Sequence, residues 1–205
     1  QQVSSAASDV YKRQSIDCEI IHHNNSEHKE KIAAENNQET FGNLSSLLKC
    51  FEIAKSEQSD LIYFVEDDYL HYDHSLVDML DTYERISSQH KDEIIVCPSD
   101  YPFNYMTNEK TNILIGSKQH WRIITKMLCT FMISKKMFQK HINNFEKTCE
   151  KRHDPFEKYL NEILQKEIAI SPIKSLAIHL TNVNSSYGLS PFIDYKKLWD
   201  ENKVK

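Results

Sequence analysis

The sequence predicts an α/β fold in which helices cover a largely parallel central sheet. Short apolar or β-branched runs alternate along the chain with amphipathic helical patterns, which is typical of strands joined by crossover helices. One run, LIYFV at residues 61–65, is apolar throughout, which indicates a central strand covered on both faces. The chain has 205 residues, of which 40% are hydrophobic, so it is long enough to bury a sizeable core.

The first half of the chain contains four expected elements. Residues 17–23 (DCEIIHH) are short, β-branched and flanked by polar residues, so we expect a strand there. A polar helix is expected at residues 26–36. Asn43 is expected to cap a second helix, in which apolar side chains recur at the helical period as far as Ala54. The strand at residues 61–65 follows this helix.

The second half continues the alternation of helices and strands. Apolar residues at helical spacing predict a helix over residues 76–86, and the run IIVC predicts a strand at residues 94–97. Residues 113–115 and 129–133 are expected to form two further strands. The second of these is expected to run into a helix over residues 137–145.

The beginning of the sequence has a composition of its own. Residues 1–14 are polar, small and aperiodic, and they lack the apolar middle segment of a secretory signal. Residues 9–14 (DVYKRQ) can be encoded by the end sequence of transposons used to prepare sequencing libraries. We therefore expect residues 1–14 to be either a translated adaptor on a truncated metagenomic reading frame or a natural disordered tail. One domain is expected over residues 15–205.

The composition argues against several classes of protein. The net charge is -5, and no clustered Lys/Arg stripe offers the positive charge that nucleic-acid phosphates need. No apolar run approaches the roughly 20 residues of a membrane-spanning helix. The five cysteines are widely spaced without a C-x-x-C pair, which favours reduced thiols and a cytoplasmic location. Only 3 glycines are present, so glycine-rich phosphate loops are excluded.

An acidic turn is the most informative feature of the sequence. Glu66, Asp67 and Asp68 directly follow the apolar strand, and ligands in open α/β sheets collect at the carboxyl ends of strands. Carboxylate oxygens suit Mg²⁺ or Mn²⁺, and these ions commonly bind substrate phosphates. The turn therefore indicates a site for a metal-bound phosphorylated substrate. The alternative is a solvated turn in which Asp68 or Asp73 caps the following helix.

The segment around this turn resembles a known family. Residues 63–69 (YFVEDDY) are similar to the D-x-D segment of family-2-like glycosyltransferases of the GT-A fold, which often read E-D-D after an apolar strand. The preceding helix, which begins Gly42-Asn43-Leu44-Ser45, resembles the stretch before this motif. The resemblance extends more weakly through Ser134 to a late histidine, His179, and covers most of the chain from Asp17 onward.

The resemblance implies a GT-A-like domain that binds a nucleotide-diphosphate sugar with Mn²⁺ or Mg²⁺. Asp68 and Asp67 are expected on the metal, and His179 is expected to complete its coordination. Glu66 or Asp67 is expected to touch the ribose or the waters of the ion, and Asn43 is counted with the nucleotide-sugar site. A lone histidine such as His179 is also commonly a structural residue. Such enzymes begin with a strand whose loop holds the base, and we expect this chain to lack that first strand.

Transfer of a sugar also requires a base for the acceptor hydroxyl, because that hydroxyl loses its proton. Asp154 is the first candidate, since similar enzymes place a carboxylate at the start of the corresponding helix, and here the pair reads His153-Asp154. Asp154-Pro155-Phe156-Glu157 is equally a helix start, with a capping Asp, an early Pro and a Glu three residues later. Asp100, in the Pro-rich loop after the strand at residues 94–97, is the second candidate. Its alternative is an ordinary turn aspartate.

Two other groups of residues carry side chains that could bind a ligand. Trp121 and Arg122 offer a flat apolar face for a sugar ring and a cation for phosphate, although a partly buried structural Trp is an equally good interpretation. His22, His23 and His28 form a histidine-rich patch. Because no cysteine or carboxylate lies at metal-site spacing around them, we expect them on the surface.

Together with the acidic turn, the resemblance implies a metal-dependent glycosyltransferase of the hexosyltransferase class, of the inverting type. It would move a sugar from a nucleotide-diphosphate donor to a glycan or another hydroxyl acceptor. The divalent ion would stabilise the negative charge that grows on the leaving phosphate. One alternative is another divalent-metal phosphoesterase, such as a phosphatase or nuclease, that uses the same acidic turn. The other is a non-catalytic nucleotide-sugar-binding domain.

Overall fold

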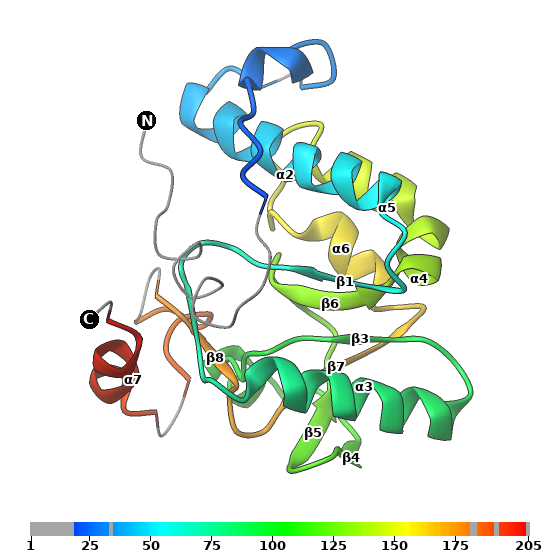
Figure 1. Cartoon of the computed structure of the whole chain (residues 1–205), viewed down its shortest axis with the longest axis vertical. Coiled ribbons are helices and arrows are strands. Elements are labelled where there is room, and N and C mark those ends of the chain that lie inside the picture. Colours follow the sequence, from blue (N-terminus) through cyan, green and yellow to red (C-terminus); the bar gives the residue numbers. More distant parts are fainter. Residues whose placement is uncertain (1–18, 33–34, 181–183, 191–192, 204–205) are drawn as a thin grey trace.

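A computed structural model describes residues 19–32, 35–180, 184–190 and 193–203 and shows a mixed α/β fold (Figure 1). The expected tail at residues 1–14 lies outside the described residues. The α-helices are α2 (Gln38–Ser56), α3 (Ser75–His90), α4 (Lys135–Lys140), α5 (Ile142–Thr148), α6 (Lys158–Ile163) and α7 (Tyr195–Asn202). The strands are β1 (Leu61–Phe64), β2 (Tyr69–His71), β3 (Ile94–Val96), β4 (Ile113–Ile115), β5 (His120–Ile123), β6 (Phe131–Ser134), β7 (Ile168–Pro172) and β8 (Ala177–His179).

The main sheet has six strands in the order β1-β6-β3-β7-β5-β4. Only the β3 and β7 pair is parallel among these described strands, and the other neighbours are antiparallel. The prediction of a largely parallel sheet is therefore wrong. The connection between β3 and β6 carries the β4 and β5 hairpin, which is closed by a tight turn at residues 116–119. Strands joined by such a short turn run antiparallel.

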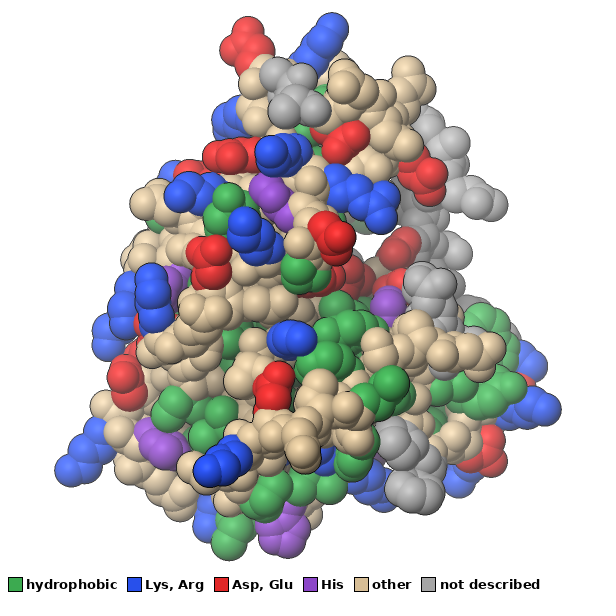
Figure 2. All heavy atoms as spheres, turned by 180° about the vertical axis from the view of Figure 1, so that it is seen from behind, with side chains coloured by type: hydrophobic (Ala, Val, Ile, Leu, Met, Phe, Trp, Pro, Cys, Tyr) green, Lys and Arg blue, Asp and Glu red, His purple; other side chains and the backbone are tan. Residues whose placement is uncertain are grey.

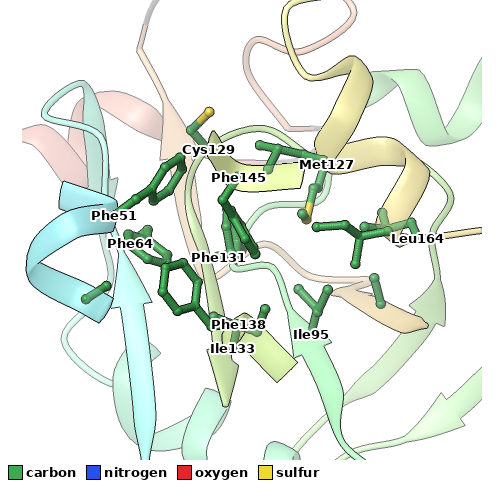
Figure 3. Packing of buried hydrophobic residues seen from close by; sticks show 14 of the residues in the cluster. Phe51, Phe64, Ile95, Met127, Cys129, Phe131, Ile133, Phe138, Phe145 and Leu164 are labelled. Carbon is green, nitrogen blue, oxygen red and sulfur yellow. The ribbon is translucent and has the colours of Figure 1, made fainter. Parts of the chain in front are cut away.

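The sheet lies between two helical layers. Figure 1 shows α3 on one face and α2, α4, α5 and α6 on the other. Alternate strand residues divide between the faces, so Ile95 packs toward the four helices while Ile94 and Val96 pack toward α3. The larger core is rich in phenylalanine (Figure 3), and the rings of Phe138 and Phe145 have centroids 4.8 Å apart. The apolar helix faces predicted from the sequence therefore supply both cores.

Several local predictions near the beginning of the chain are corrected. Residues 19–23 of the expected strand at residues 17–23 form no strand, and the expected polar helix is reduced to a short 3₁₀ helix, η1 (Asn25–His28). The cap of α2 is Asn37, whose side-chain oxygen accepts a hydrogen bond from the Thr40 backbone at 3.0 Å. Asn43 lies exposed inside α2. The first turn of α2 shows little apolar periodicity, which is why the sequence pattern placed the helix start too late.

The strand β1 takes an edge position, and this corrects the expectation of a central strand. Among the described strands only β6 pairs with it, in the register Leu61 to Ser134 through Phe64 to Phe131. The fully buried strands are β3 and β6, at the middle of the sheet. The expected strands at residues 94–97, 113–115 and 129–133 are confirmed with small shifts at their ends.

A second, two-stranded sheet forms beside the main one. Its strands β2 and β8 are antiparallel, with Tyr69 opposite His179 and His71 opposite Ala177. Helix α7 packs against this pair through Leu198. Neither strand was predicted, because each spans only three residues and carries no extended apolar pattern. None of the described helices has the length and apolar character that crossing a bilayer requires.

Candidate functional site

The acidic turn joins β1 to β2, and the β2–β8 pairing places His179 beside it. The Asp68 Oδ2 atom lies 3.0 Å from His179 Nε2, although the two residues are 111 positions apart in the sequence. The Leu180 backbone N–H also donates a hydrogen bond to the Asp68 carbonyl at 2.9 Å. On its other side, His179 Nδ1 lies 2.9 Å from the Tyr187 carbonyl oxygen. The two residues that the resemblance assigned to one site are therefore in direct contact.

The orientation of the His179 ring has a chemical consequence. Because a carbonyl oxygen only accepts, Nδ1 carries the hydrogen that it donates to Tyr187. In a neutral ring Nε2 then presents a lone pair to the Asp68 carboxylate, and two electron-rich atoms at 3.0 Å repel each other. A proton or a metal cation between the two atoms removes this repulsion. The contact accordingly suits a positive charge.

Electrostatics at the turn depend on burial and on neighbouring carboxylates. Burial lowers the pKa of His179, but the contacts with Asp68 and the Tyr187 carbonyl and the negative charges of Asp68 and Glu66 raise that pKa above its ordinary value. Burial raises the pKa of Glu66 to about 7, and the charge of Asp68 acts in the same direction. His179 and the Thr130 hydroxyl oppose this shift. Glu66 therefore exchanges a proton near neutral pH.

Two further side chains, those of Thr130 and Glu157, interact with this turn, and the sequence had predicted neither of them as a site residue. The Thr130 hydroxyl, fully buried, accepts a hydrogen bond from the Glu66 backbone N–H at 2.9 Å and donates one to Glu66 Oε2 at 3.3 Å. Burial raises the pKa of Glu157, and the charge of His179 lowers it. Glu157 also contributes to the raised pKa of Glu66. Asp67, which lies between the half-buried Glu66 and Asp68, is exposed.

The donor atoms at this turn determine whether it can bind a metal ion. Among the described residues, no three His, Cys, Asp or Glu side chains are grouped closely enough to hold a metal ion by themselves. A carboxylate oxygen of Asp68 and an imidazole nitrogen of His179 nevertheless lie next to each other, and both are donors that Mn²⁺ accepts. Mg²⁺ typically takes one or two protein carboxylates and completes its shell with waters and substrate phosphates. The donor pair fits an ion of this kind that is held partly by its substrate.

The first candidate base, Asp154, lies in an exposed segment before α6. The expectation that Asp154 caps this helix is wrong, because α6 begins at Lys158 after Glu157. Residues 155–158 instead form a turn, closed by a hydrogen bond from the Lys158 N–H to the Pro155 carbonyl at 3.1 Å. The acidic side chain of this segment that interacts with His179 is Glu157. The only sequence signal for Glu157 was its place three residues after the expected cap.

The second candidate base, Asp100, belongs to a different cluster. It is 2% exposed and accepts a hydrogen bond from the Tyr105 hydroxyl, while its other oxygen lies 3.6 Å from Arg122 Nη2. Burial raises the pKa of Asp100, although Tyr105, Arg122 and the Asn104 amide oppose the shift. Arg122 is 9% exposed, and its guanidinium lies 4.3 Å from the centre of the Tyr105 ring. The positive charge of Arg122 therefore pairs with Asp100, whereas the sequence had predicted that it would bind a phosphate.

The tryptophan next to Arg122 is a core residue. Trp121 is 0% exposed and packs in the core on the α3 side of the sheet, with Met79 and Val96 among its neighbours. Adjacent strand residues point to opposite faces, so Arg122 projects from the other face. The flat face of Trp121 that the sequence offered to a sugar ring is closed by this packing. The structure therefore supports the alternative interpretation, in which Trp121 is a structural residue.

Aromatic contacts connect the acidic turn with the loop after β3. The Tyr69 ring stacks on His179 with centroids 4.9 Å apart, and the Tyr69 and Tyr101 hydroxyls are hydrogen-bonded. The Phe103 ring stacks on Tyr187 at 5.2 Å, with only 9° between the ring planes. The 3₁₀ helix η2 (Pro102–Tyr105) carries Phe103 and the residues that reach Arg122. The acidic turn and the Asp100 cluster are thus joined by one packed loop.

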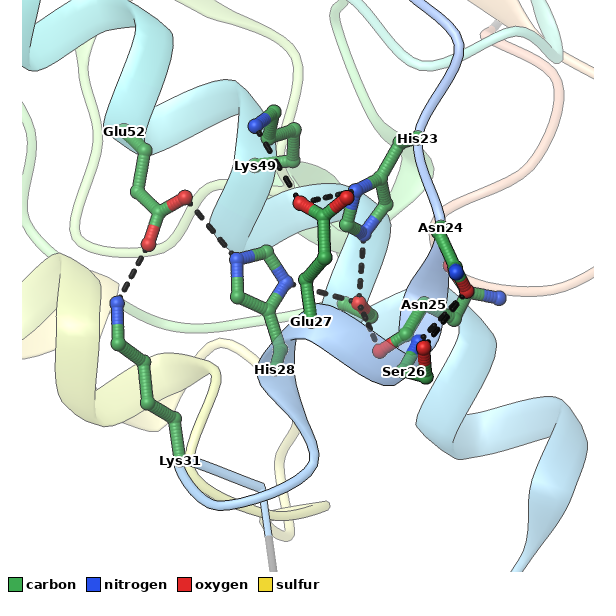
Figure 4. A network of polar contacts seen from close by, with 10 residues as sticks. His23, Asn24, Asn25, Ser26, Glu27, His28, Lys31, Lys49 and Glu52 are labelled. Carbon is green, nitrogen blue, oxygen red and sulfur yellow. Dashed lines mark hydrogen bonds and ion pairs between the residues drawn. The ribbon is translucent and has the colours of Figure 1, made fainter.

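A third polar cluster holds the N-terminal described segment against α2 (Figure 4). The prediction that His28 is a surface residue is wrong, because it is 2% exposed. Its Nδ1 lies 2.9 Å from the Ser45 hydroxyl and its Nε2 lies 3.0 Å from Glu52 Oε2. His23 Nε2 shares the same hydroxyl at 2.7 Å, and Lys31 pairs with Glu52 at 2.5 Å. Because Ser45 is fully buried, this group ties the segment to α2 and offers no accessible nucleophile.

The surface does not concentrate charge of one sign on the face in Figure 2, where basic and acidic side chains are interspersed. This distribution gives no electrostatic stripe for a nucleic-acid backbone on that face. Neither the family models nor the curated proteins with which the sequence was compared give a match.

Proposed function

We propose that the chain is a metal-dependent glycosyltransferase with a GT-A-like, family-2-like layered fold. The donor is a nucleotide-diphosphate sugar, and the acceptor is a hydroxyl group of a glycan or related molecule. The proposal rests chiefly on the contact between Asp68 and His179 at the carboxyl end of an apolar strand. The Asp68 carboxylate and the His179 ring nitrogen that faces it can together bind a cation. A cation with only two protein ligands has coordination positions left for a diphosphate.

Asp68 and His179 would hold the ion, with the exposed Asp67 beside them. When bound, Mn²⁺ or Mg²⁺ supplies Lewis-acid stabilisation of the negative charge on the leaving diphosphate. His179 is held in place by the Tyr187 carbonyl, and Tyr69 stacks against its ring. These contacts fix the ring orientation, which is the usual task of residues around a metal-binding histidine.

Glu66 is suited to binding a ribose hydroxyl or a water at this turn. With a pKa of about 7 it offers both protonated and ionised carboxyl groups at neutral pH, so it can donate as well as accept. Asp154 remains the proposed base for the acceptor hydroxyl, and Glu157 is the second choice because its charge interacts with His179. Matched Asp154→Asn and Glu157→Gln variants distinguish the two candidate bases. Only substitution of the true base should lower kcat without weakening donor binding.

A two-metal phosphoesterase is less well supported. Such enzymes hold two ions about 4 Å apart and need several carboxylates around them. Asp100, which the sequence offered for this purpose, is hydrogen-bonded to Tyr105 and paired with Arg122. Of the described carboxylates near Asp68, Asp67 is exposed, and burial raises the pKa of Glu66 and Glu157.

Calorimetric titration of UDP and GDP, with and without Mn²⁺, tests the proposal. We expect binding of one nucleotide that requires Mn²⁺ and that weakens at least about tenfold in Asp68→Asn, the range seen when metal-site groups are removed. Asp73→Asn is the matched control, because Asp73 is exposed and lies beyond the turn. Equal binding by Asp68→Asn and the unmodified chain would refute the site. Metal-dependent binding without sugar transfer to any acceptor would favour the non-catalytic alternative.

A further inference from the structure

The orientation of the His179 ring depends on a residue outside the sheet. His179 Nδ1 donates to the Tyr187 carbonyl at 2.9 Å, and this leaves Nε2 directed at Asp68. Tyr187 belongs to the loop between β8 and α7, so the pairing of β8 with β2 does not fix the place of its carbonyl. The contacts that hold Tyr187 therefore also determine whether His179 presents Nε2 to a cation.

The loop after β3 holds Tyr187 through Phe103 and Tyr101. The Phe103 and Tyr187 rings are stacked, with centroids 5.2 Å apart and 9° between their planes. The Phe103 backbone N–H also donates to the Ser186 carbonyl at 2.7 Å. The Tyr101 ring meets the Tyr187 ring edge-on, with centroids 5.7 Å apart. The loop after β3 thus contacts both the side chain of Tyr187 and the backbone directly before it.

The same loop supports the face of the His179 ring. The Tyr69 ring stacks on His179 with centroids 4.9 Å apart, and the Tyr69 hydroxyl is hydrogen-bonded to the Tyr101 hydroxyl. Tyr69 and Tyr101 are 8% and 2% exposed, so water does not compete for this bond. Tyr101 therefore acts on the face of the ring through Tyr69, while Phe103 acts on Nδ1 through Tyr187.

The base of this loop is fastened to the strand that carries His179. The Leu176 N–H donates to the Pro98 carbonyl at 2.8 Å, and the Ser99 hydroxyl donates to the Ala177 carbonyl at 2.7 Å. Ala177 is the first residue of β8 and His179 is its last. The loop and the histidine are thus held against each other at short range, so the loop side chains have a defined position relative to the imidazole ring.

We propose that Phe103 and Tyr101 are positioning residues for His179. Phe103 keeps the Tyr187 carbonyl at Nδ1, and Tyr101 keeps Tyr69 against the ring, so that Nε2 is free of hydrogen when a cation binds. In this role neither residue touches the ion. The assignment of the ion to a nucleotide-diphosphate sugar rests on the proposed function.

Loss of this support has a defined chemical result. If the Tyr187 carbonyl moves away, a neutral His179 ring can carry its hydrogen on Nε2 and donate it to Asp68. A hydrogen on Nε2 takes the position that a cation needs. The contacts of Phe103 and Tyr187 therefore favour the form of His179 that binds a metal ion.

The exchange of the His179 Nδ1 proton with water, measured by NMR on the metal-free chain, tests the proposal. Phe103→Ala removes the ring stack and retains the backbone N–H that bonds Ser186. We expect the proton to exchange at least about fivefold faster in Phe103→Ala, since an aromatic pair is lost. Phe103→Leu keeps apolar bulk but cannot stack, so it should also exchange faster. Phe103→Tyr keeps a ring that stacks and should retain the slow exchange of the unmodified chain.

Two controls separate positioning from a general loss of structure. The Trp121 indole N–H is buried in the core on the α3 side, whereas Phe103 packs in a separate small cluster, so the Trp121 rate should not change. Met106→Ala, at a 72% exposed residue directly after η2, should change neither rate. An unchanged His179 rate in both Phe103→Ala and Phe103→Leu would overturn the proposal. A Trp121 rate that rises by the same factor as the His179 rate would overturn it as well.

Nucleotide titration separates this proposal from the proposed function. With Mn²⁺ present, the affinity for UDP or GDP should fall at least about fivefold in Phe103→Ala and should be retained in Phe103→Tyr. Faster Nδ1 exchange in Phe103→Ala, in a chain that binds neither nucleotide, would retain the positioning role and remove the transferase. Mn²⁺-dependent binding through Asp68, with unchanged exchange in Phe103→Ala, would retain the transferase and remove the positioning role.

Discussion

Acid should destabilise the protein through His71, the last residue of β2. Burial lowers the pKa of this histidine from 6.5 to about 4, and its Nε2 lies 2.6 Å from the Tyr63 hydroxyl. The folded chain therefore keeps His71 neutral at a pH where the unfolded chain already protonates it. Because the unfolded state binds more protons between about pH 6.5 and pH 4, the free energy of unfolding falls as the pH decreases through this window. Between pH 7 and pH 5 this single group accounts for a loss of about 2 kcal/mol.

Urea denaturation at pH 7 and pH 5 measures this effect, with the fluorescence of the buried Trp121 as the reporter. His71→Gln retains a polar side chain but cannot titrate, so its loss of stability between the two pH values should be smaller by about 2 kcal/mol. His74→Gln, an exposed residue three positions later, should behave as the unmodified chain does. Identical pH dependence in His71→Gln and the unmodified chain would refute the reasoning.

Three further predictions concern packing and hydrogen bonding, and the same urea measurement at pH 7 checks them. Phe145→Ala empties a fully buried ring site and should cost about 3–5 kcal/mol. Gly116→Ala places a Cβ 2.2 Å from Trp121 Nε1 and should cost about 1–3 kcal/mol, whereas Gly42→Ala, with its nearest atom at 3.4 Å inside a helix, should be neutral or stabilising. Ser45→Ala removes a buried hydroxyl shared by two histidines and should cost about 1–3 kcal/mol. A cost below about 0.5 kcal/mol for Phe145, Gly116 or Ser45 would contradict the packing described for that residue.

The elements that were predicted correctly are those whose pattern is local. Helix α3 shows regular apolar spacing, and β3 and the first three residues of β6 are apolar because both faces of these strands are covered. The direction in which strands pair depends on how the chain returns to the sheet, and periodicity contains no such information. Strand β7 was not predicted. Its sequence, IAISP, ends in proline, which argues against a strand inside a sheet, yet β7 lies inside the main sheet.

Part of the candidate site could also be read from the sequence. Asp68 and His179 were assigned to one site by resemblance alone, and their contact requires the pairing of β2 with β8. Glu157 was assigned to a helix cap because its local pattern was that of a cap. Arg122 was expected to face a phosphate, but a neutralising partner on another loop cannot be foreseen from residues near it in the sequence. Sequence patterns here identified residue types capable of chemistry more reliably than the partners of those residues.

The position of the site follows from the short second sheet more than from the main one. If β8 paired with β2 one residue out of register, the side chain of His179 would point to the other face and Asp68 would lose it. The register is held by apolar packing on one side, where Leu70 and Ile178 contact Leu198 of α7, and by the Leu180–Asp68 backbone hydrogen bond on the other. Helix α7 therefore stabilises the contact between Asp68 and His179 indirectly, because its Leu198 packs on Leu70 and Ile178 and so holds the register of β2 and β8. A Leu198→Ala variant should lower stability and also weaken the Mn²⁺-dependent nucleotide binding that we propose, whereas Trp199→Ala, exposed on the same helix, should change neither.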